Sequence, residues 1–375
     1  MITRVVKLRY VRRCKAMSLV NVHNEWDPLE EVIVGRAANA QIARPDIGLF
    51  AVEYREYGCV ENVPSGPYSQ RVIEETEEDL DALVETFERL DIVVRRPEVW
   101  RHAQTFSTPD WITDGQYNYC PRDLFVPVGK TIIEAPMTLR ARALETLSFK
   151  PILLDYLRSG SRWVSAPKPR LVDEVYNVVD TDNLALRDHE PVFDAANILR
   201  VGRDILYLIS DTANRSGAHW LQTFLGSEYR VRAYDNVYTG SHVDTTITLV
   251  RPGLVVVNAE RIHPGNLPDM FRDWDVIYLS EVVDIGYTGT VYASKWIGMN
   301  FMMVNPGLAI VERAQEPLIR ELAKRRVDVI PLRMRHARTM GGGFHCVTLD
   351  VRRRGALEHY CRGKRNEGEI PNWKK

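Results

Sequence analysis

Four similar segments recur along the chain, and this repetition restricts the fold more than any other feature. Each segment has two arms rich in strand-forming apolar residues on either side of a glycine-containing turn, which is the pattern of a β-hairpin. The four segments are DLFVPVGKTIIE (123–134), ANILRVGRDILYLI (196–209), DTTITLVRPGLVVVN (244–258) and NFMMVNPGLAIVER (300–313). A unit repeated at a spacing of about 50 residues or more is typical of a propeller or an array, not of two unrelated domains.

Three of the hairpins are followed by a helix candidate and then by another strand candidate. These pairs are SGAHWLQTFLG with YRVRAYD, NLPDMFRDW with DVIYLS, and EPLIRELAKR with VDVIPLR. The first hairpin leads instead into a longer helical segment, RARALETLSFKPILLDYLRSG (140–160), and a proline-rich loop around SAPKPRL.

A fifth unit is split between the two ends of the chain. EEVIVG (30–35) and DIVVRR (91–96) read as strands, and the segment 70–90 between them has apolar residues at positions 80, 83, 84, 87 and 90, which is helical spacing. CVTLDVRR (346–353) supplies the missing strand. Five such units, closed by joining the ends, predict a ring in which equivalent ends of the units face a central axis.

Composition excludes several classes of protein. The 375 residues are 45% hydrophobic, which is enough for a sizeable core. With 49 basic and 50 acidic residues the net charge is -1, so we expect neither a nucleic acid nor a membrane surface as a partner. No run approaches the ~18 apolar residues of a membrane span. The five cysteines lack CxxC spacing, so we expect no disulfide framework, no metal and a reducing cytoplasmic location.

The domain boundaries follow from the ends of the patterned region. We expect one domain over 19–362, with a flexible basic tail at 1–18 and a short tail at 363–375. The first sixteen residues hold six basic residues and no acidic one, without the apolar core of a secretion signal. Two alternatives stay open for them: a role in organelle targeting, and a native start of translation at Met17.

Polar residues at matching ends of the repeated units should converge on the axis of the ring. They are Asp123, Asp194, His242, Asp244 and Cys346. A metal site is one interpretation, but only His242 and Asp244 have the short spacing of a ligand pair. The other interpretation is that the carboxylates hold a planar guanidinium cation while the thiolate attacks it and the histidine moves protons.

Each of these residues also has an ordinary structural explanation. An aspartate before a strand, such as Asp123 or Asp194, is most often a turn former. His242 could lie exposed in a loop, and a free cysteine such as Cys346 is most often a small buried apolar residue. The glycines at 341–343 could be a hinge. Their combination at matching positions of the repeated units favours a catalytic site over these separate structural explanations.

The segment GGGFHCVTLDVRRRG (341–355) resembles the nucleophile segment of the amidinotransferases, a family of the guanidine-modifying superfamily. CPRDLF, EAPMTLRAR, FDAANILR, SHVDTT and SKWIGMN are similar to the family's other motifs, in the same order. The resemblance covers roughly Leu19 to Tyr360. It implies a five-bladed pseudo-symmetric α/β propeller of ββαβ modules, which agrees with the number of repeated units.

The resemblance implies a reaction in which L-arginine gives its amidino group to an amine acceptor through an amidino-cysteine, with ornithine released. Cys346 matches the nucleophile, and His242 matches the residue that protonates the leaving amine and deprotonates the incoming one. Asp194 matches the partner of that histidine. His345 precedes Cys346 and would point to the opposite face of a strand, so we expect a structural role for it. The resemblance implies a homodimer and implies no cofactor.

The resemblance also implies a set of substrate-binding residues. Asp123 and Asp244 match the acids that hold the guanidinium, and Arg261 matches an arginine that binds the donor's carboxylate. Gly343 belongs to the glycines that lack a Cβ atom, which would let the backbone turn sharply and let substrate approach the sulfur.

Three positions depart from the glycine-using amidinotransferases and bear on the acceptor. Ser241 stands in place of a methionine and Thr239 in place of an asparagine, which predicts a different or larger acceptor. Ala293 and Ser294 replace two serines, so one hydroxyl is missing. VNVHNEWDPLEEVIVG (20–35) and SGSRWVSAPKPRL (159–171) are most similar to natural-product members, namely streptomycin-type inosamine-phosphate enzymes and the saxitoxin-pathway enzyme. The absence of an alanine excess favours the saxitoxin type.

Three rival functions remain. An arginine deiminase-type hydrolase or a dimethylarginine hydrolase would use nearly the same residues, with water resolving the intermediate; CPRDLF and EAPMTLRAR favour transfer. A non-catalytic propeller would bind partners through its rim, but the retained Cys346, His242 and Asp194 argue against it. A cysteine protease also has cysteine and histidine, yet no oxyanion-binding arrangement is predicted.

Overall fold

The computed structural model describes residues 20–180 and 182–361. The two tails expected at 1–18 and 363–375 lie outside these described residues. Within the described residues, no helix is both long and apolar enough to cross a membrane.

Five three-stranded sheets in the described residues share one topology, in which a central strand pairs antiparallel with one neighbour and parallel with the other. The sheets are β7 (Phe125–Val128), β8 (Thr131–Glu134) and β9 (Arg162–Ser165); β10 (Ile198–Val201), β11 (Asp204–Leu208) and β12 (Arg230–Tyr234); β13 (Ile247–Arg251), β14 (Leu254–Asn258) and β15 (Asp275–Leu279); β16 (Met302–Asn305), β17 (Leu308–Glu312) and β18 (Asp328–Leu332); and β19 (Thr348–Arg353), β1 (Leu29–Val34) and β4 (Val93–Arg95).

All four hairpins predicted from the sequence are present as the antiparallel pairs of the first four sheets. The fifth sheet confirms that the two ends of the chain complete one unit, because β1 pairs antiparallel with β19 and parallel with β4.

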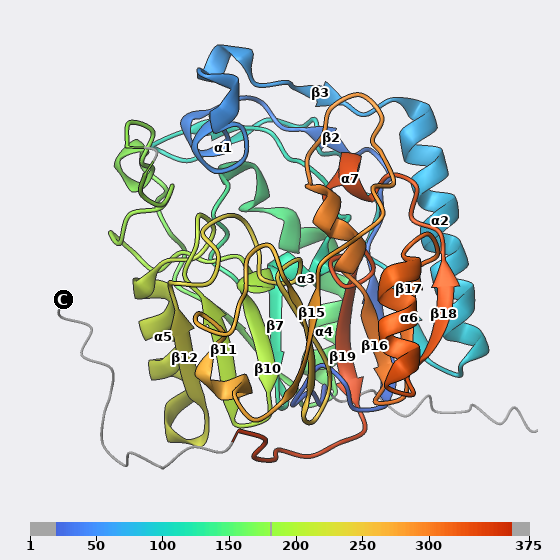
Figure 1. The fold of residues 1–375 in the computed structure, drawn as a ribbon. Coiled ribbons are helices and arrows are strands. Elements are labelled where there is room, and N and C mark those ends of the chain that lie inside the picture. The colour runs from blue at the N-terminus through green and yellow to red at the C-terminus, as the bar shows by residue number, and fades with distance from the viewer. Residues whose placement is uncertain (1–19, 181, 362–375) are drawn as a thin grey trace, which may run out of the picture.

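Helices connect the second and third strands of most units. They are α4 (Lys150–Arg158), α5 (Arg215–Leu225), α6 (Glu316–Lys324) and α2 (Gln70–Arg89). The Ser69 hydroxyl caps α2 by accepting from the Val72 amide, and Asn214 caps α5 through the Gly217 amide, so polar residues fix where these helices begin. In Figure 1, α2 and α6 lie on one side of the central strands and α5 on the other.

Two predicted helices differ from the structure. NLPDMFRDW forms only the 3-10 turn η8 (Asp269–Phe271), in which Met270 and Phe271 are buried. Leu267, Met270, Phe271 and Trp274 have helical spacing and pack in one hydrophobic cluster, but the segment is short and Pro268 directly precedes the 3-10 turn, so an α-helix of this length would be marginal. The segment 140–160 is divided into η3 (Arg140–Arg142), η4 (Glu145–Phe149) and α4, which begins next to Pro151.

The remaining elements are short. They are α1 (Ile47–Glu53), α3 (Pro121–Leu124), α7 (Ala337–Met340), β2 (Gln41–Ile42), β3 (Gly66–Pro67), β5 (Phe106–Ser107), β6 (Ile112–Thr113), η1 (Arg55–Tyr57), η2 (Val60–Asn62), η5 (Asp173–Val175), η6 (Ala195–Asn197), η7 (Gly226–Glu228) and η9 (Lys295–Met299). Figure 1 shows α1, β2, β3 and α7 grouped at the top, above the ends of the central strands.

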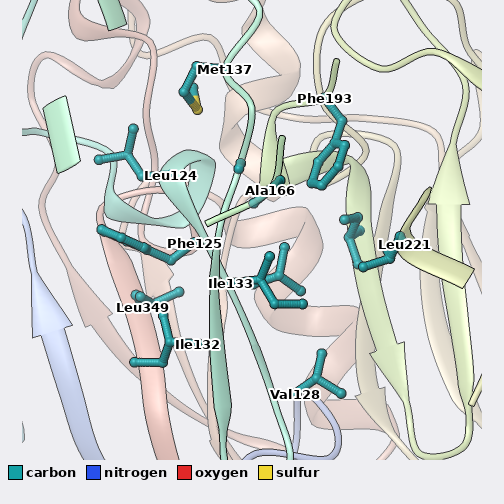
Figure 2. Close-up of a cluster of buried hydrophobic side chains, with 14 of the residues drawn as sticks. Leu124, Phe125, Val128, Ile132, Ile133, Met137, Ala166, Phe193, Leu221 and Leu349 are labelled. Atoms are coloured by element: carbon teal, nitrogen blue, oxygen red, sulfur yellow. The ribbon is translucent and has the colours of Figure 1, made fainter. Parts of the chain in front are cut away.

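Neighbouring sheets share hydrophobic cores. One cluster joins the β7–β9 sheet to the β10–β12 sheet and to β19, and three others join each remaining pair of successive sheets, including β16–β18 with β1. Figure 2 shows how the β7–β8 hairpin is buried on both faces: Phe125 and Ile132 point to the side of Leu349, and Ile133 points to the side of Leu221. The α/β class is therefore confirmed, whereas closure of the sheets into a propeller stays a prediction.

Candidate active site

The predicted site residues occupy equivalent places in the repeat, just before the first strand of each sheet. Asp123 lies in α3 before β7, and Asp194 precedes β10. His242 and Asp244 precede β13, and Cys346 precedes β19. The structure brings all five together as predicted, although no two of the four chain segments that carry them are adjacent in sequence.

His242 is held between two aspartates. Its Nε2 lies 3.1 Å from Asp194 Oδ2 and its Nδ1 lies 3.7 Å from Asp123 Oδ1. The other Asp194 oxygen accepts from the Thr138 amide at 2.9 Å, so that carboxylate is fixed. His242 also has a φ of 64°, a left-handed conformation that non-glycine residues rarely adopt and that recurs at functional sites.

The charges around His242 favour its protonated form. Burial alone would lower the pKa, but the negative charge of Asp123 and the hydrogen bond and charge of Asp194 raise it to about 10. The same pairing holds the pKa of Asp194 below its ordinary value against the effect of burial. An imidazolium at this place can donate a proton to a leaving group at neutral pH.

Cys346 is buried, with 2% of its surface exposed. Its Sγ lies 3.2 Å from Asp244 Oδ2 and accepts from Asn300 Nδ2 at 3.1 Å. A hydrogen bond with the Cys120 thiol, burial and the charge of Asp244 together raise the pKa of Cys346 well above the ordinary value of a thiol. The thiol form of Cys346 is therefore favoured over the thiolate in the structure as it stands, even beside a protonated His242.

His345 takes part in the site more closely than the strand geometry predicted. Residues 344–347 form a turn and β19 begins only at Thr348, so alternation of side chains does not apply. His345 Nδ1 lies 2.9 Å from Asp244 Oδ2, the oxygen that also faces Cys346, and its Nε2 lies 3.4 Å from Glu25. This contact helps hold the pKa of Asp244 at about 2, against burial.

Two carboxylate oxygens in the site lack a hydrogen-bond partner within the described residues. They are Asp123 Oδ1 and Asp244 Oδ1, both buried. Asp123 Oδ2 is occupied by Arg142, whose Nη1 donates at 2.8 Å, and Arg142 Nε in turn donates to Glu145 at 2.9 Å. Buried acceptors left open in this way suit a cationic donor group such as a guanidinium.

The other predicted substrate-binding residues lie in loops around the site. Arg261 donates to the hydroxyls of Thr245 and Thr246 at 3.0 and 2.7 Å, and its guanidinium stacks 3.8 Å from the Tyr238 ring. Ser294 accepts from the Trp296 amide at 3.3 Å and caps η9.

Two further predicted positions lie on the segment that carries His242. Thr239 is exposed, and its carbonyl accepts from the Asp211 amide at 2.7 Å. Ser241 Oγ donates to Glu53 Oε1 at 3.3 Å.

The glycines before Cys346 are required by close packing. A Cβ on Gly343 would lie 2.8 Å from Asn300, and one on Gly342 would lie 2.6 Å from the Cys120 sulfur. Gly341 has a φ of 80° and ends α7. The predicted sharp turn is present at Gly341, and Gly343 makes room for Asn300, which also accepts from the Cys346 amide.

Four residues of the site were not assigned roles from the sequence: Asn300, Arg142, Cys120 and Glu53. Asn300 precedes β16 and so occupies in the fourth repeat the place that Asp123 and Asp194 hold in theirs. The role of Asn300 could therefore have been predicted from its position in the repeat. The other three depend on contacts between distant segments.

The described residues hold no group of three or more His, Cys, Asp or Glu side chains arranged to bind a metal ion. The absence of a metal requirement stays a prediction for solution experiments.

Comparison with known proteins places the chain among relatives that span almost its whole length. No family model matches it. An inosamine-phosphate amidinotransferase from Streptomyces glaucescens is 55% identical over 346 residues, covering 92% of this chain and 99% of the relative. The solved structure of the enzyme of that name from Streptomyces griseus has 53% identity and a TM-score of 0.91, covering 92% of this chain and all (100%) of the other.

An amidinotransferase of the saxitoxin biosynthetic pathway from Microseira wollei is less similar. Its structure has 34% identity and a TM-score of 0.84, covering 91% of this chain and 99% of the other. The preference for a saxitoxin-type enzyme, drawn from alanine content, is therefore not supported. With relatives of 55% and 34% identity aligned over nearly their full lengths, and with the thiol, imidazole and carboxylates gathered at one place, the chain belongs to the amidinotransferase family.

Proposed function

We propose that this enzyme transfers the amidino group of L-arginine to an amine acceptor in two half-reactions, through an amidino group covalently held on Cys346. The observation that carries the proposal is that Asp123 lies beside His242 and Asp244 beside Cys346, and that each carboxylate has one buried oxygen with no hydrogen-bond partner within the described residues. A guanidinium is a resonance-stabilised, poor electrophile, so fixing it between carboxylates and protonating its leaving nitrogen must supply most of the activation.

In the first half-reaction the donor guanidinium lies against Asp123 and Asp244. Its positive charge offsets the carboxylates that keep Cys346 protonated, so the thiol releases its proton to solvent as the donor binds and becomes a thiolate. The sulfur attacks the central carbon while the His242 imidazolium gives its proton to the departing nitrogen. Ornithine leaves as an amine, and the amidino group stays on sulfur. Arg261, whose guanidinium donates to the Thr245 and Thr246 hydroxyls, binds the donor's carboxylate.

In the second half-reaction an acceptor amine attacks the same carbon, and neutral His242 takes one of its protons as the carbon–sulfur bond breaks. We propose that the acceptor is an inosamine phosphate, as the names of the relatives with 55% and 53% identity state for those enzymes. The small side chain of Ser241 leaves room for a ring-shaped acceptor beside His242.

We also propose that the five sheets are the blades of a closed, pseudo-symmetric propeller with the site at its axis, and that the enzyme works in the cytoplasm as a homodimer. The shared topology of the sheets and the cores between successive sheets support the propeller. A hydrolase of the same superfamily would use a similar site, and no observation favours it over transfer.

The first experiment mixes the enzyme with arginine alone and follows intact mass together with ornithine and citrulline. The proposal expects an adduct of one amidino group on Cys346 and ornithine in equal amount, and it expects Cys346→Ser to give neither. Sustained production of citrulline would identify a hydrolase. A chelator should leave the reaction unchanged, and inhibition by it would point to a metal.

A further inference from the structure

Glu53 is a carboxyl group of the site that the two half-reactions above leave without a role. It is the last residue of α1, which lies at the top of the molecule in Figure 1. Ser241, 188 positions further along the chain, donates its hydroxyl to Glu53 Oε1 at 3.3 Å, and Ser241 is covalently bonded to His242. The glutamate therefore faces the acid–base residue from the cover over the strand ends.

The surroundings of Glu53 make it a base near neutral pH. Burial, followed by the opposing charge of His242 and the like charge of Asp194, sets its pKa at about 7. Its hydrogen bond with Ser241 and the charge of Arg142 lower the pKa. The groups that face it from the other elements are His242, Asp194, Arg142, Ser241, Tyr54, Tyr68 and Tyr292.

Counting protons shows that the second half-reaction needs such a base. An aliphatic amine with a basicity similar to that of lysine, with a pKa of ~10.4, arrives as an ammonium ion. The ammonium must lose one proton before the nitrogen can attack and a second when the new carbon–nitrogen bond forms. His242 gave one proton to ornithine, so it can take back only one.

The other carboxylates around His242, Arg142 and Cys346 already have partners or a role. Asp194 is hydrogen-bonded to His242, and Glu145 accepts from Arg142. Asp123 and Asp244 hold the amidino group on either side. Among the described carboxyl groups close to His242, Glu53 has only a neutral hydroxyl as its recorded hydrogen-bond partner.

We propose that Glu53 binds the ammonium group of the acceptor and takes its first proton; this inference rests on the proposed function. The ammonium R–NH3+ gives one proton to the Glu53 carboxylate and becomes R–NH2. Its lone pair forms the bond to the amidino carbon, and a second proton passes to neutral His242. The carbon–sulfur bond breaks with its electron pair on Cys346, which regenerates the thiolate and the imidazolium, and Glu53 releases its proton to solvent.

The test separates the half-reactions in Glu53→Gln, which keeps the size of the side chain and removes the base. Ornithine release from arginine alone reports the first half-reaction. The isolated amidino-enzyme is then mixed with ethanolamine, an ammonium ion at neutral pH that shares the amino-alcohol group of an inosamine, or with hydroxylamine, a much weaker base that is already neutral. Glu56→Gln, on the same segment but exposed, is the matched control.

The inference expects Glu53→Gln to slow transfer to ethanolamine by roughly 10²-fold, the lower range for removal of a general base, with the other two rates changed by less than about 3-fold. The wild-type rate with ethanolamine should level off above about pH 7, where Glu53 is ionised, whereas the variant's rate should keep rising with the free amine. Glu56→Gln should match the wild type.

Several outcomes would overturn the inference. Equal slowing of ethanolamine and hydroxylamine, no slowing of either, or a wild-type amidino-enzyme that accepts hydroxylamine but not ethanolamine would each do so. If the wild type forms no amidino-enzyme and releases no ornithine, the proposed function itself fails, which is a separate result.

Discussion

Cys346 Sγ lies 3.2 Å from Asp244 Oδ2, so the thiol that we propose as the nucleophile faces a carboxylate. In the enzyme without substrate this contact keeps the proton on sulfur, because a thiolate beside a carboxylate would be repelled. A thiol of this kind is protected from alkylating agents until a cationic substrate arrives. The same carboxylate that disfavours the thiolate at rest is the one that we propose binds the substrate.

We therefore expect Asp244→Asn to make Cys346 more reactive in the free enzyme while abolishing ornithine release. Removing the charge lowers the pKa of the thiol, and each unit of lowering raises the thiolate fraction about 10-fold. The measurement is the rate of iodoacetamide alkylation at Cys346, resolved by peptide mass spectrometry. Asp273→Asn, an exposed change on the same repeat, should behave as the wild type. Unchanged alkylation in Asp244→Asn would contradict this account of the thiol.

Cys120 is expected to restrain the same thiol through its hydrogen bond. Cys120→Ala removes the partner, so the pKa of Cys346 should fall and alkylation in the free enzyme should accelerate. Because the proposed half-reactions give Cys120 no role, arginine turnover should change by only a few-fold. Cys120→Ser keeps a hydrogen-bonding group and should stay close to the wild type. If alanine and serine gave the same alkylation rate, the hydrogen bond would not be what restrains Cys346.

Much of the fold could be predicted from local sequence, because each hairpin has two arms rich in strand-forming apolar residues on either side of a glycine-containing turn. The pairing of β1 with β19 was predictable too, since two incomplete units at the chain ends complement each other. The α-helix expected at 266–274 is wrong although its apolar residues do pack in the core, because a segment this short forms only the 3-10 turn that follows Pro268.

Only those site residues that occupy equivalent positions in the repeated units could be predicted from the sequence. Asp123, Asp194, His242, Asp244 and Cys346 precede the first strands of their sheets, so symmetry brings them together. Glu53 has no such signal, because its place depends on how α1 packs over the strand ends and meets Ser241. His345 was placed on the wrong face because a turn, not a strand, carries it.

Asp194 fixes both the orientation and the charge of His242, so Asp194→Asn should lower ornithine release by roughly 10²-fold or more. The way in which ornithine release depends on pH follows from the raised pKa of His242, which is about 10. As the acid, His242 is active while protonated, and its activity is lost as pH rises through that value. In the variant the alkaline limb should move to lower pH, as measured by the ornithine burst between pH 7 and 10. Asp235→Asn, an exposed change, should leave the limb in place. An unshifted limb would mean that another group sets the charge of His242.

A buried network of ion pairs centred on Asp350, in the strand that follows the turn at 344–347, should largely determine how stable the fold is at low pH. Asp350 Oδ1 lies 2.7 Å from both Arg122 and Arg200, and its Oδ2 lies 2.5 Å from Arg353 Nε. Arg200 also binds Glu25, which reaches His345. Asp350→Asn leaves the arginine charges without their shared partner, which for a buried ion pair costs about 3–5 kcal/mol of unfolding free energy.

The pH dependence of that loss gives the network a sharper test. Despite burial, the arginine charges hold the pKa of Asp350 below its ordinary value, so its stabilisation is present above the unfolded pKa of ~3.9 and is lost as pH falls through the folded value. Urea unfolding of wild type and Asp350→Asn should therefore differ most near neutral pH, and the difference should shrink below about pH 4. Asp328→Asn, which is exposed on β18, should change stability by less than about 0.5 kcal/mol. A difference that stayed constant with pH would show that Asp350 acts through packing and not through its charge.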